Sequence, residues 1–208
     1  MATYIIQLRY NRFQRRNEEK VMLVWVPVTF FVLLLFWIII IYNRLVSLRN
    51  EVKNAWKQID VQLKRRHDLI PNLVSVVKAY MDFERNTLEK VTAARARAIS
   101  ALGIREKASA ETSLTRALSG LFVVMENYPV LKSNENVMQL QEELISTEDR
   151  IAFSRQFYND LVANFSTAIE SFPNNIIASF FAFHKTEYFS AGEDEKERPV
   201  AELYSRTR

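Results

Sequence analysis

The 208-residue chain contains no cysteine and only 3 glycines, 5 prolines and 2 histidines. The lack of cysteine excludes disulfides, thiolate metal ligands and cysteine nucleophiles. Because tight turns depend on glycine and proline, their scarcity argues against a β-rich fold and against glycine-rich phosphate loops. The two histidines are far apart in the sequence, which argues against a histidine-based metal site. The composition therefore predicts a protein of long helices that needs no cofactor.

Charge is distributed unevenly along the chain. Residues 1–20 carry five basic and two acidic side chains, residues 21–42 carry none, and residues 43–208 carry 23 basic and 22 acidic ones. The net charge of +4 therefore arises mainly in the N-terminal arm and not on a basic face of the domain. Since nucleic-acid-binding domains carry clustered basic residues, we expect no nucleic-acid partner.

The uncharged residues 21–42, VMLVWVPVTFFVLLLFWIIIIY, predict a transmembrane helix. At 1.5 Å per residue they span about 33 Å, slightly more than the roughly 30 Å hydrocarbon layer. Trp25, Trp37 and Tyr42 lie near the ends, where aromatic side chains favour the interface. A signal peptide would have a shorter apolar stretch and a small-residue cleavage site. We therefore expect a single membrane-spanning helix, with the lipid bilayer as a partner.

Residues 43–83 carry an apolar seam whose members are three or four residues apart, as on one face of a helix. The seam consists of Leu45, Leu48, Val52, Trp56, Ile59, Leu63, Ile70, Leu73, Val77 and Tyr80. Arg66 interrupts it, and Pro71 lies within it. Because the register agrees on both sides of Pro71, we expect one kinked helix rather than two.

Two shorter helices are expected next. Asn86, followed by Glu89 three residues later, has the spacing of a capping box, so a second helix should begin there and end near Gly103. A third helix should begin near Ser109 and be stopped by Pro129. Its apolar stripe consists of Leu114, Leu118, Leu121, Met125 and Tyr128.

The clearest pattern predicts a fourth helix over residues 134–172, ended by Pro173. Its heptad positions are Val137, Leu144, Ile151, Tyr158, Phe165 and Phe172. The first and fourth helices would each be about 60 Å long, and short connections make successive helices antiparallel. We therefore predict an all-α fold. One N-terminal transmembrane helix is followed by an elongated antiparallel four-helix bundle, with a short apolar helix after the fourth helix.

A short apolar segment and an acidic tail complete the chain. Residues 176–183, IIASFFAF, are too short to span a bilayer, so they either cap the base of the bundle or dip into the headgroup region. In the second case the side chains that contact lipid would be Ile176, Ile177, Phe180, Phe181 and Phe183. The tail is expected to be extended and solvated, or else to lie along a basic groove or a partner. The sequence thus divides into a basic arm (1–20), a transmembrane helix (21–42), a helical bundle (43–185) and an acidic tail (186–208).

A polar layer is expected to cross the apolar bundle. Aligning the first and fourth helices antiparallel places Arg66 level with Ile151, among polar residues. The layer would comprise Arg66, His67, Asp68, Thr147, Glu148, Arg150 and Ser154, with Arg66–Glu148 and Asp68–Arg150 as ion pairs. It either fixes helix register or binds a ligand in a cleft opened by the Pro71 kink. Exchanging the charges of Arg66 and Glu148 should restore what either change alone destroys.

The sequence offers no catalytic or metal-ligating arrangement. His67 and Asp68 are adjacent, but neighbours on a helix point about 100° apart. Motifs of zinc proteases, of serine hydrolases and of phosphate loops do not occur. We therefore predict no catalytic, cofactor-binding or metal-binding residues, and a protein that is not an enzyme.

Two long segments resemble the LemA family: residues 42–80, which begin YNRLVSLRNEVKNAWKQIDVQLKRRHDLIP, and residues 128–173, which begin YPVLKSNENVMQLQEELISTEDR. Weaker similarity follows in NNIIASFFAF and YFSAGEDE. The resemblance implies a bacterial protein with an N-terminal anchor and an α-helical bundle, without established catalytic activity or cofactor. Family members are commonly associated with HtpX-type membrane zinc metalloproteases and with TPM-domain proteins, and the resemblance suggests such partners here.

The resemblance also implies a single-pass protein of the bacterial inner (cytoplasmic) membrane. In the family the anchor usually begins almost at the initiator methionine, so the 20-residue basic arm is a departure. Lys and Arg are nearly balanced on the two sides of residues 21–42, and the positive-inside rule therefore does not fix the orientation. From the resemblance we expect the bundle on the cytoplasmic side.

These observations favour a membrane-anchored, non-enzymatic interaction or scaffold protein that acts through the outer faces of its bundle and could form homo-oligomers. The alternative is an adaptor or regulatory subunit of an HtpX-type membrane zinc metalloprotease in envelope stress and quality control. A signalling receptor would need a sensory domain, of which the sequence gives no sign.

Overall fold

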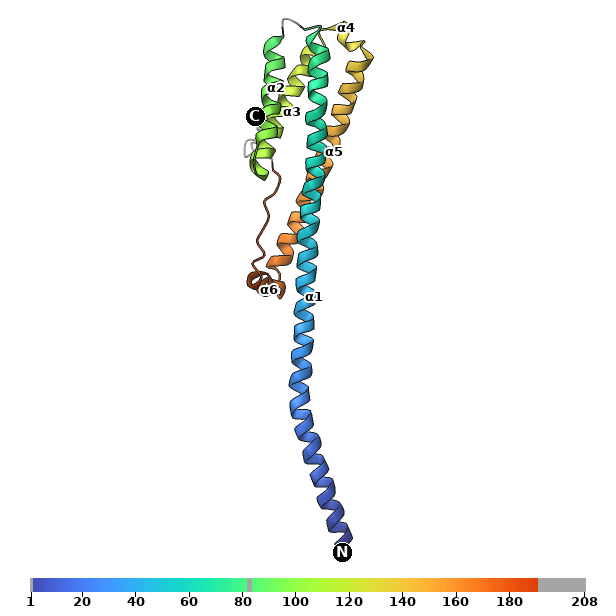
Figure 1. Ribbon diagram of the computed structural model, residues 1–208, viewed down its shortest axis with the longest axis vertical. Helices are drawn as coiled ribbons and strands as arrows, with labels where there is room; N and C mark the ends of the chain where they lie inside the picture. Colours follow the sequence, from blue (N-terminus) through green and yellow to red (C-terminus); the bar gives the residue numbers. More distant parts are fainter. Residues whose placement is uncertain (1, 82–83, 191–208) are drawn as a thin grey trace, which may run out of the picture. The chain divides into compact units, whose positions relative to one another are not determined.

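The computed structural model describes residues 2–81 and 84–190, with side chains from Trp25 onward (Figure 1). Its helices are α1 (Ala2–Lys78), α2 (Arg85–Ser100), α3 (Ile104–Met125), α4 (Pro129–Lys132), α5 (Glu135–Glu170) and α6 (Asn174–Phe180). The all-helical fold, the long apolar N-terminal helix and the antiparallel packing of helices are confirmed.

The chain forms two compact units, and α1 contributes to both. The first unit contains the described residues up to Ser47 together with Ala168–His184. The second contains Leu48–Thr167 and the described residues from Lys185 onward. Much of the predicted acidic tail lies outside the described residues.

The second unit is held together by an apolar core to which five helices contribute. Its buried members come from α1 (Ile70, Leu73, Val77), α2 (Leu88, Val91, Ala94, Ala98), α3 (Leu114, Leu118, Leu121, Met125), α4 (Leu131) and α5 (Val137, Leu144). α1 passes through Pro71 without interruption and ends at Lys78. Because the chain leaves the helix there, Tyr80 is exposed and Met81 is buried in the core, so the predicted burial of Tyr80 is wrong.

A tight connection joins α2 to α3. Gly103 has a positive φ of 82° and directly precedes Ile104, the first residue of α3. The backbone N–H of Leu102 donates to Glu106 Oε2 at 3.1 Å. The expectation that the third helix begins near Ser109 is therefore wrong by five residues, because the same glycine that follows α2 also starts α3.

Gly103→Ala should lower the free energy of unfolding by about 1 kcal/mol, because an L side chain is strained at positive φ. An added Cβ at Gly103 or at Gly120 would have no neighbouring atom within 4 Å. The two substitutions should therefore differ in their effect on stability only through the backbone conformation at each position. Gly120 lies inside α3, and Gly120→Ala should therefore stabilise by about 0.5–1 kcal/mol. Thermal unfolding of the full chain in detergent micelles, followed by circular dichroism, measures both. Equal losses at the two positions would contradict the described backbone.

The other helix boundaries agree with the sequence only in part. α2 begins at Arg85 without a side-chain cap, so the predicted capping box at Asn86 is wrong. α3 ends at Met125, and Pro129 begins the short helix α4. The predicted start of the fourth helix is confirmed, because Asn134 Oδ1 accepts hydrogen bonds from the N–H groups of residues 136 and 137.

The heptad pattern predicted for α5 describes most of its buried face. The residues at 137, 144, 151, 158 and 165 are buried, as are Val162 and Ile169. Phe172 is 80% exposed, so its predicted place in the core is wrong. α5 has already ended at Glu170, and a helix of 3.6 residues per turn drifts away from a strict seven-residue repeat.

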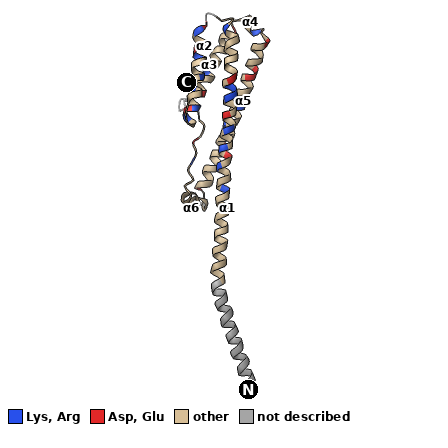
Figure 2. Ribbon diagram, viewed as in Figure 1, with Lys and Arg blue, Asp and Glu red and all other residues tan. Residues whose placement is uncertain are grey.

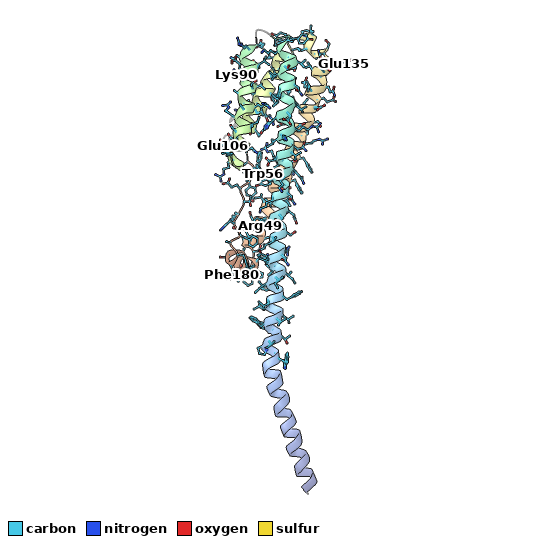
Figure 3. All side chains as sticks on the ribbon, viewed as in Figure 1. Arg49, Trp56, Lys90, Glu106, Glu135 and Phe180 are labelled. Atoms are coloured by element: carbon cyan, nitrogen blue, oxygen red, sulfur yellow. The ribbon has the colours of Figure 1, made fainter. Side chains whose placement is uncertain are left out.

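In the first unit, α1 packs against the segment that contains α6. The ring of Tyr42 lies 4.7 Å from that of Phe181 and 5.9 Å from that of Phe183, measured between centroids. Ile177 and Ala178 of α6 are buried. Phe180, at the end of α6, is 82% exposed (Figure 3).

Candidate functional site

A buried arginine joins three helices of the second unit. Arg66 on α1 is 1% exposed, and its Nη1 lies 2.6 Å from Glu148 Oε2 on α5. Its Nη2 donates to Thr115 Oγ1 on α3 at 2.8 Å. Glu111 Oε2, also on α3, lies 3.6 Å from Nη1. The guanidinium group is therefore paired with carboxylates from two different helices.

His67 extends this network to α2. Its Nε2 lies 2.7 Å from Glu111 Oε1, and its backbone carbonyl accepts a hydrogen bond from Arg95 Nε at 2.7 Å. Both His67 and Glu111 are buried. We refer to Arg66, His67, Arg95, Glu111, Thr115 and Glu148 as the polar cluster.

The structure brings together only part of the predicted polar layer. Asp68 and Arg150 are exposed, and within the described chain they form no ion pair with each other. Thr147 is buried, but its hydroxyl donates to the backbone carbonyl of Glu143 at 2.7 Å. Ser154 is half-buried. The Arg66–Glu148 pair is present, whereas the Asp68–Arg150 pair is not.

Sequence reasoning missed Glu111, Thr115 and Arg95. A signal for Glu111 existed, because it lies three residues before Leu114 and so falls on the buried stripe of α3. A charged residue at a seam position needs a buried partner. Arg66, the charged residue in the seam of α1, is that partner. Nothing comparable marks Arg95, whose contact is with a backbone carbonyl.

The charges of the polar cluster are paired with one another, but two of its buried atoms, Arg66 Nε and Glu111 Oε2, have no hydrogen-bond partner among the described residues. The guanidinium faces two carboxylates, and one of these also contacts the imidazole. Over the residues that the structure describes, no group of three or more His, Asp and Glu side chains is placed to hold a metal ion. The cluster links side chains of α1, α3 and α5 and the backbone of α1 to α2, and the choice between fixing helix register and binding a ligand stays a prediction.

The apolar part of α1 is almost entirely exposed. Over Trp25–Lys78, the residues whose side chains are described, α1 is long and apolar enough to cross a membrane. Only 6% of its most apolar 18-residue window is buried. Figure 2 shows a stretch of this helix whose ribbon is tan, with neither blue nor red residues. A bilayer would cover such a surface.

The predicted interfacial segment is divided between buried and exposed side chains. Ile177 and Phe183 are buried, which excludes them from lipid contact, whereas Ile176, Phe180 and Phe181 are exposed. Lipid contact stays a prediction, now limited to these three side chains.

The outer face of α5 carries an exposed apolar row. Ile145, Phe153 and Phe157 are all exposed, Phe153 to 72%. Their spacing in multiples of four places them on one ridge of the helix, about 18 Å long at 1.5 Å per residue, which also carries the exposed Asp149. We refer to these three residues as the α5 row. Ridges of this kind pack into grooves of neighbouring helices.

Comparisons with known proteins identify relatives over most of the chain. The sequence model of the LemA family matches residues 55–202. "Protein LemA" of Metamycoplasma hominis is 27% identical over 156 residues, which cover 74% of this chain and 71% of that protein. "Magnetosome protein MamQ 1" and "MamQ 2" of Paramagnetospirillum magneticum are each 24% identical over 174 residues, or 71% of this chain. The aligned part is 64% of each MamQ protein.

Proposed function

The chain belongs to the LemA family, and from this membership and its geometry we propose that it is a membrane-anchored, non-enzymatic scaffold protein that associates with further copies of itself. The observation that carries the proposal is the α5 row, an exposed apolar ridge on a helix whose opposite face is fully used by the core. Large exposed apolar side chains grouped on a folded domain mark interaction sites.

The anchor supports self-association in particular. A helix that crosses the bilayer confines all copies to one plane and to one orientation, which raises their effective concentration. A short apolar row then suffices, because less binding free energy is needed than for two molecules meeting in solution. We place the protein in the bacterial inner membrane as a single-pass protein with the bundle on the cytoplasmic side.

The polar cluster has a supporting role in this proposal. Because it links α1 with α2, α3 and α5, it holds the bundle in one register and so fixes which side chains of α5 face outward. A surface used for repeated, identical contacts requires such a fixed arrangement.

The mass of the full chain in a mild detergent tests the proposal. Light scattering should give a multiple of the 24.4 kDa chain. Phe153→Ser/Phe157→Ser should shift the protein to a monomer, because it removes the apolar ridge without touching the core. Val123→Ser/Val130→Ser replaces two exposed apolar residues elsewhere and should leave the mass unchanged.

The same purification separates the two functional alternatives. A stoichiometric complex with an HtpX-type membrane metalloprotease or a TPM-domain protein would support the adaptor role instead. A monomer without any partner would contradict both roles.

A further inference from the structure

A groove of about 640 Å³ lies in the second unit between α1, the start of α3, α5 and the segment that follows α6. α1 supplies most of its lining, including Arg49 and Trp56, which Figure 3 labels. Ile104 lines it from the first turn of α3 and Tyr158 from α5. The volume lies within the range of about 300–1,000 Å³ typical of small-molecule sites.

The charge in this groove has one sign. Three of its lining residues are basic, namely Arg49, Lys53 and Lys57, and none is acidic. Since they are four residues apart, they form a row about 12 Å long on one side of α1. Among the residues that the structure describes, neither Lys53 nor Lys57 forms an ion pair. The two lysine ammonium groups, without an ion-pair partner among the described residues, attract anions.

Two carboxylates close in sequence to the lining residues have other partners. Asp60 Oδ1 lies 2.8 Å from Lys107 Nζ, and Glu187 Oε1 lies 3.6 Å from Arg105 Nε. Neither is therefore committed to the lysines of the groove. An anion from outside the chain can neutralise these lysines.

The aromatic side of the groove is held in place by its neighbours. The ring of Trp56 packs against Tyr158 and Phe189, with centroid distances of 5.5 and 5.7 Å. The Tyr158 hydroxyl donates to the backbone carbonyl of Glu187 at 2.8 Å. Burial, and secondarily the charge of Glu187, raise the pKa of Tyr158 to about 12, so the phenol stays neutral. Trp56, over whose ring Lys107 Nζ lies at 5.7 Å from the centroid, thus offers a fixed aromatic surface beside the basic row.

We propose that this groove binds a phosphate group attached to an apolar or aromatic body, with Lys53 and Lys57 at the phosphate and Trp56 and Ile104 against the body. Lysine binds phosphate as a mobile point charge. Anionic phospholipids of the bilayer and soluble organic phosphates both carry this chemistry. The basic row begins seven residues after Tyr42, where the predicted transmembrane segment ends. This inference does not depend on self-association.

The fluorescence of Trp56 tests the site in the full chain. Trp25→Phe/Trp37→Phe leaves Trp56 as the sole one of the 3 tryptophans, and the protein is kept in phosphatidylcholine nanodiscs. Dioctanoyl phosphatidylglycerol and phenyl phosphate are titrated separately, with dioctanoyl phosphatidylcholine as the zwitterionic comparison. We expect a saturable change in emission that Lys53→Gln/Lys57→Gln weakens at least tenfold. Lys78→Gln/Lys90→Gln, which removes two exposed charges elsewhere on the bundle, should change the affinity less than twofold.

The two anionic probes distinguish the sources of the ligand. Saturation by phosphatidylglycerol alone assigns the groove to a lipid, and tighter saturation by phenyl phosphate assigns it to a soluble phosphate. The proposal is overturned if neither probe gives a saturable change, if phosphatidylcholine binds as tightly as phosphatidylglycerol, or if both lysine pairs weaken binding equally.

Discussion

Arg66→Met is expected to lower the free energy of unfolding by about 3–5 kcal/mol, as removal of one partner from a buried ion pair does. The loss arises at Glu111, which is 4% exposed and would lose its guanidinium partner, keeping only the contact with His67 inside the bundle. Adding Glu111→Leu to the same chain should recover most of the stability, because apolar replacement of a whole buried ion pair is often close to neutral. Chemical unfolding of the full chain in micelles measures both variants.

The neighbouring arginine supplies a matched control for this prediction. Arg65 also pairs with a glutamate on α5, Glu143, at 3.7 Å, but its side chain is 51% exposed. Arg65→Met should therefore cost less than about 1 kcal/mol. Equal losses at the two arginines would show that the polar cluster does not hold the bundle together.

The structure changes the rescue experiment that the sequence suggested for Arg66. The exchange Arg66→Glu/Glu148→Arg would leave a new carboxylate facing Glu111, which already lies 3.6 Å from the guanidinium. Like charges at this distance in the interior repel strongly. We therefore expect no rescue from the exchange, whereas removal of both Arg66 and Glu111 should succeed.

Leu33→Arg/Leu34→Arg is expected to release the protein from the membrane. The two positions lie at the middle of residues 21–42, where each arginine costs about 2.5–3.5 kcal/mol of insertion free energy. The combined cost of about 5–7 kcal/mol should prevent stable insertion. The fraction that stays in the membrane pellet after an alkaline carbonate wash measures the effect.

Two control variants accompany the anchor experiment. Leu33→Ala/Leu34→Ala changes the same positions without adding charge and should stay in the pellet. Val123→Arg/Val130→Arg adds the same two charges to exposed positions of the bundle and should also stay there. Retention of the Leu33→Arg/Leu34→Arg variant would show that α1 does not anchor the chain.

Periodicity predicted the helices well, because a buried face has to repeat with the turn of the helix. Periodicity did not predict the helix boundaries that are determined by backbone geometry rather than by burial. Gly103, whose φ is 82°, lies between α2 and α3 and directly precedes the first residue of α3. No apolar pattern marks residues 104–108. Phe172 falls on the heptad pattern but lies beyond the end of α5, where the pattern no longer predicts which side chains are buried.

The polar cluster is predicted from the side of α1 and α5 alone. Arg66 and Glu148 were paired by counting residues along two antiparallel helices of similar length. Glu111 was out of reach of that count, because α3 is shorter and its start was misplaced. The groove beside Trp56 was also hidden, since Thr186 lines it only through the path of the chain after α6.

Cross-linking in native membranes tests most directly whether the anchored bundle associates with itself through the α5 row. The chain has no cysteine, so Phe153→Cys and Val123→Cys each introduce a single reactive thiol. Mild oxidation should convert the Phe153→Cys protein largely into a covalent dimer and leave the Val123→Cys protein monomeric. Equal yields at the two positions, or no dimer at Phe153→Cys, would contradict the account.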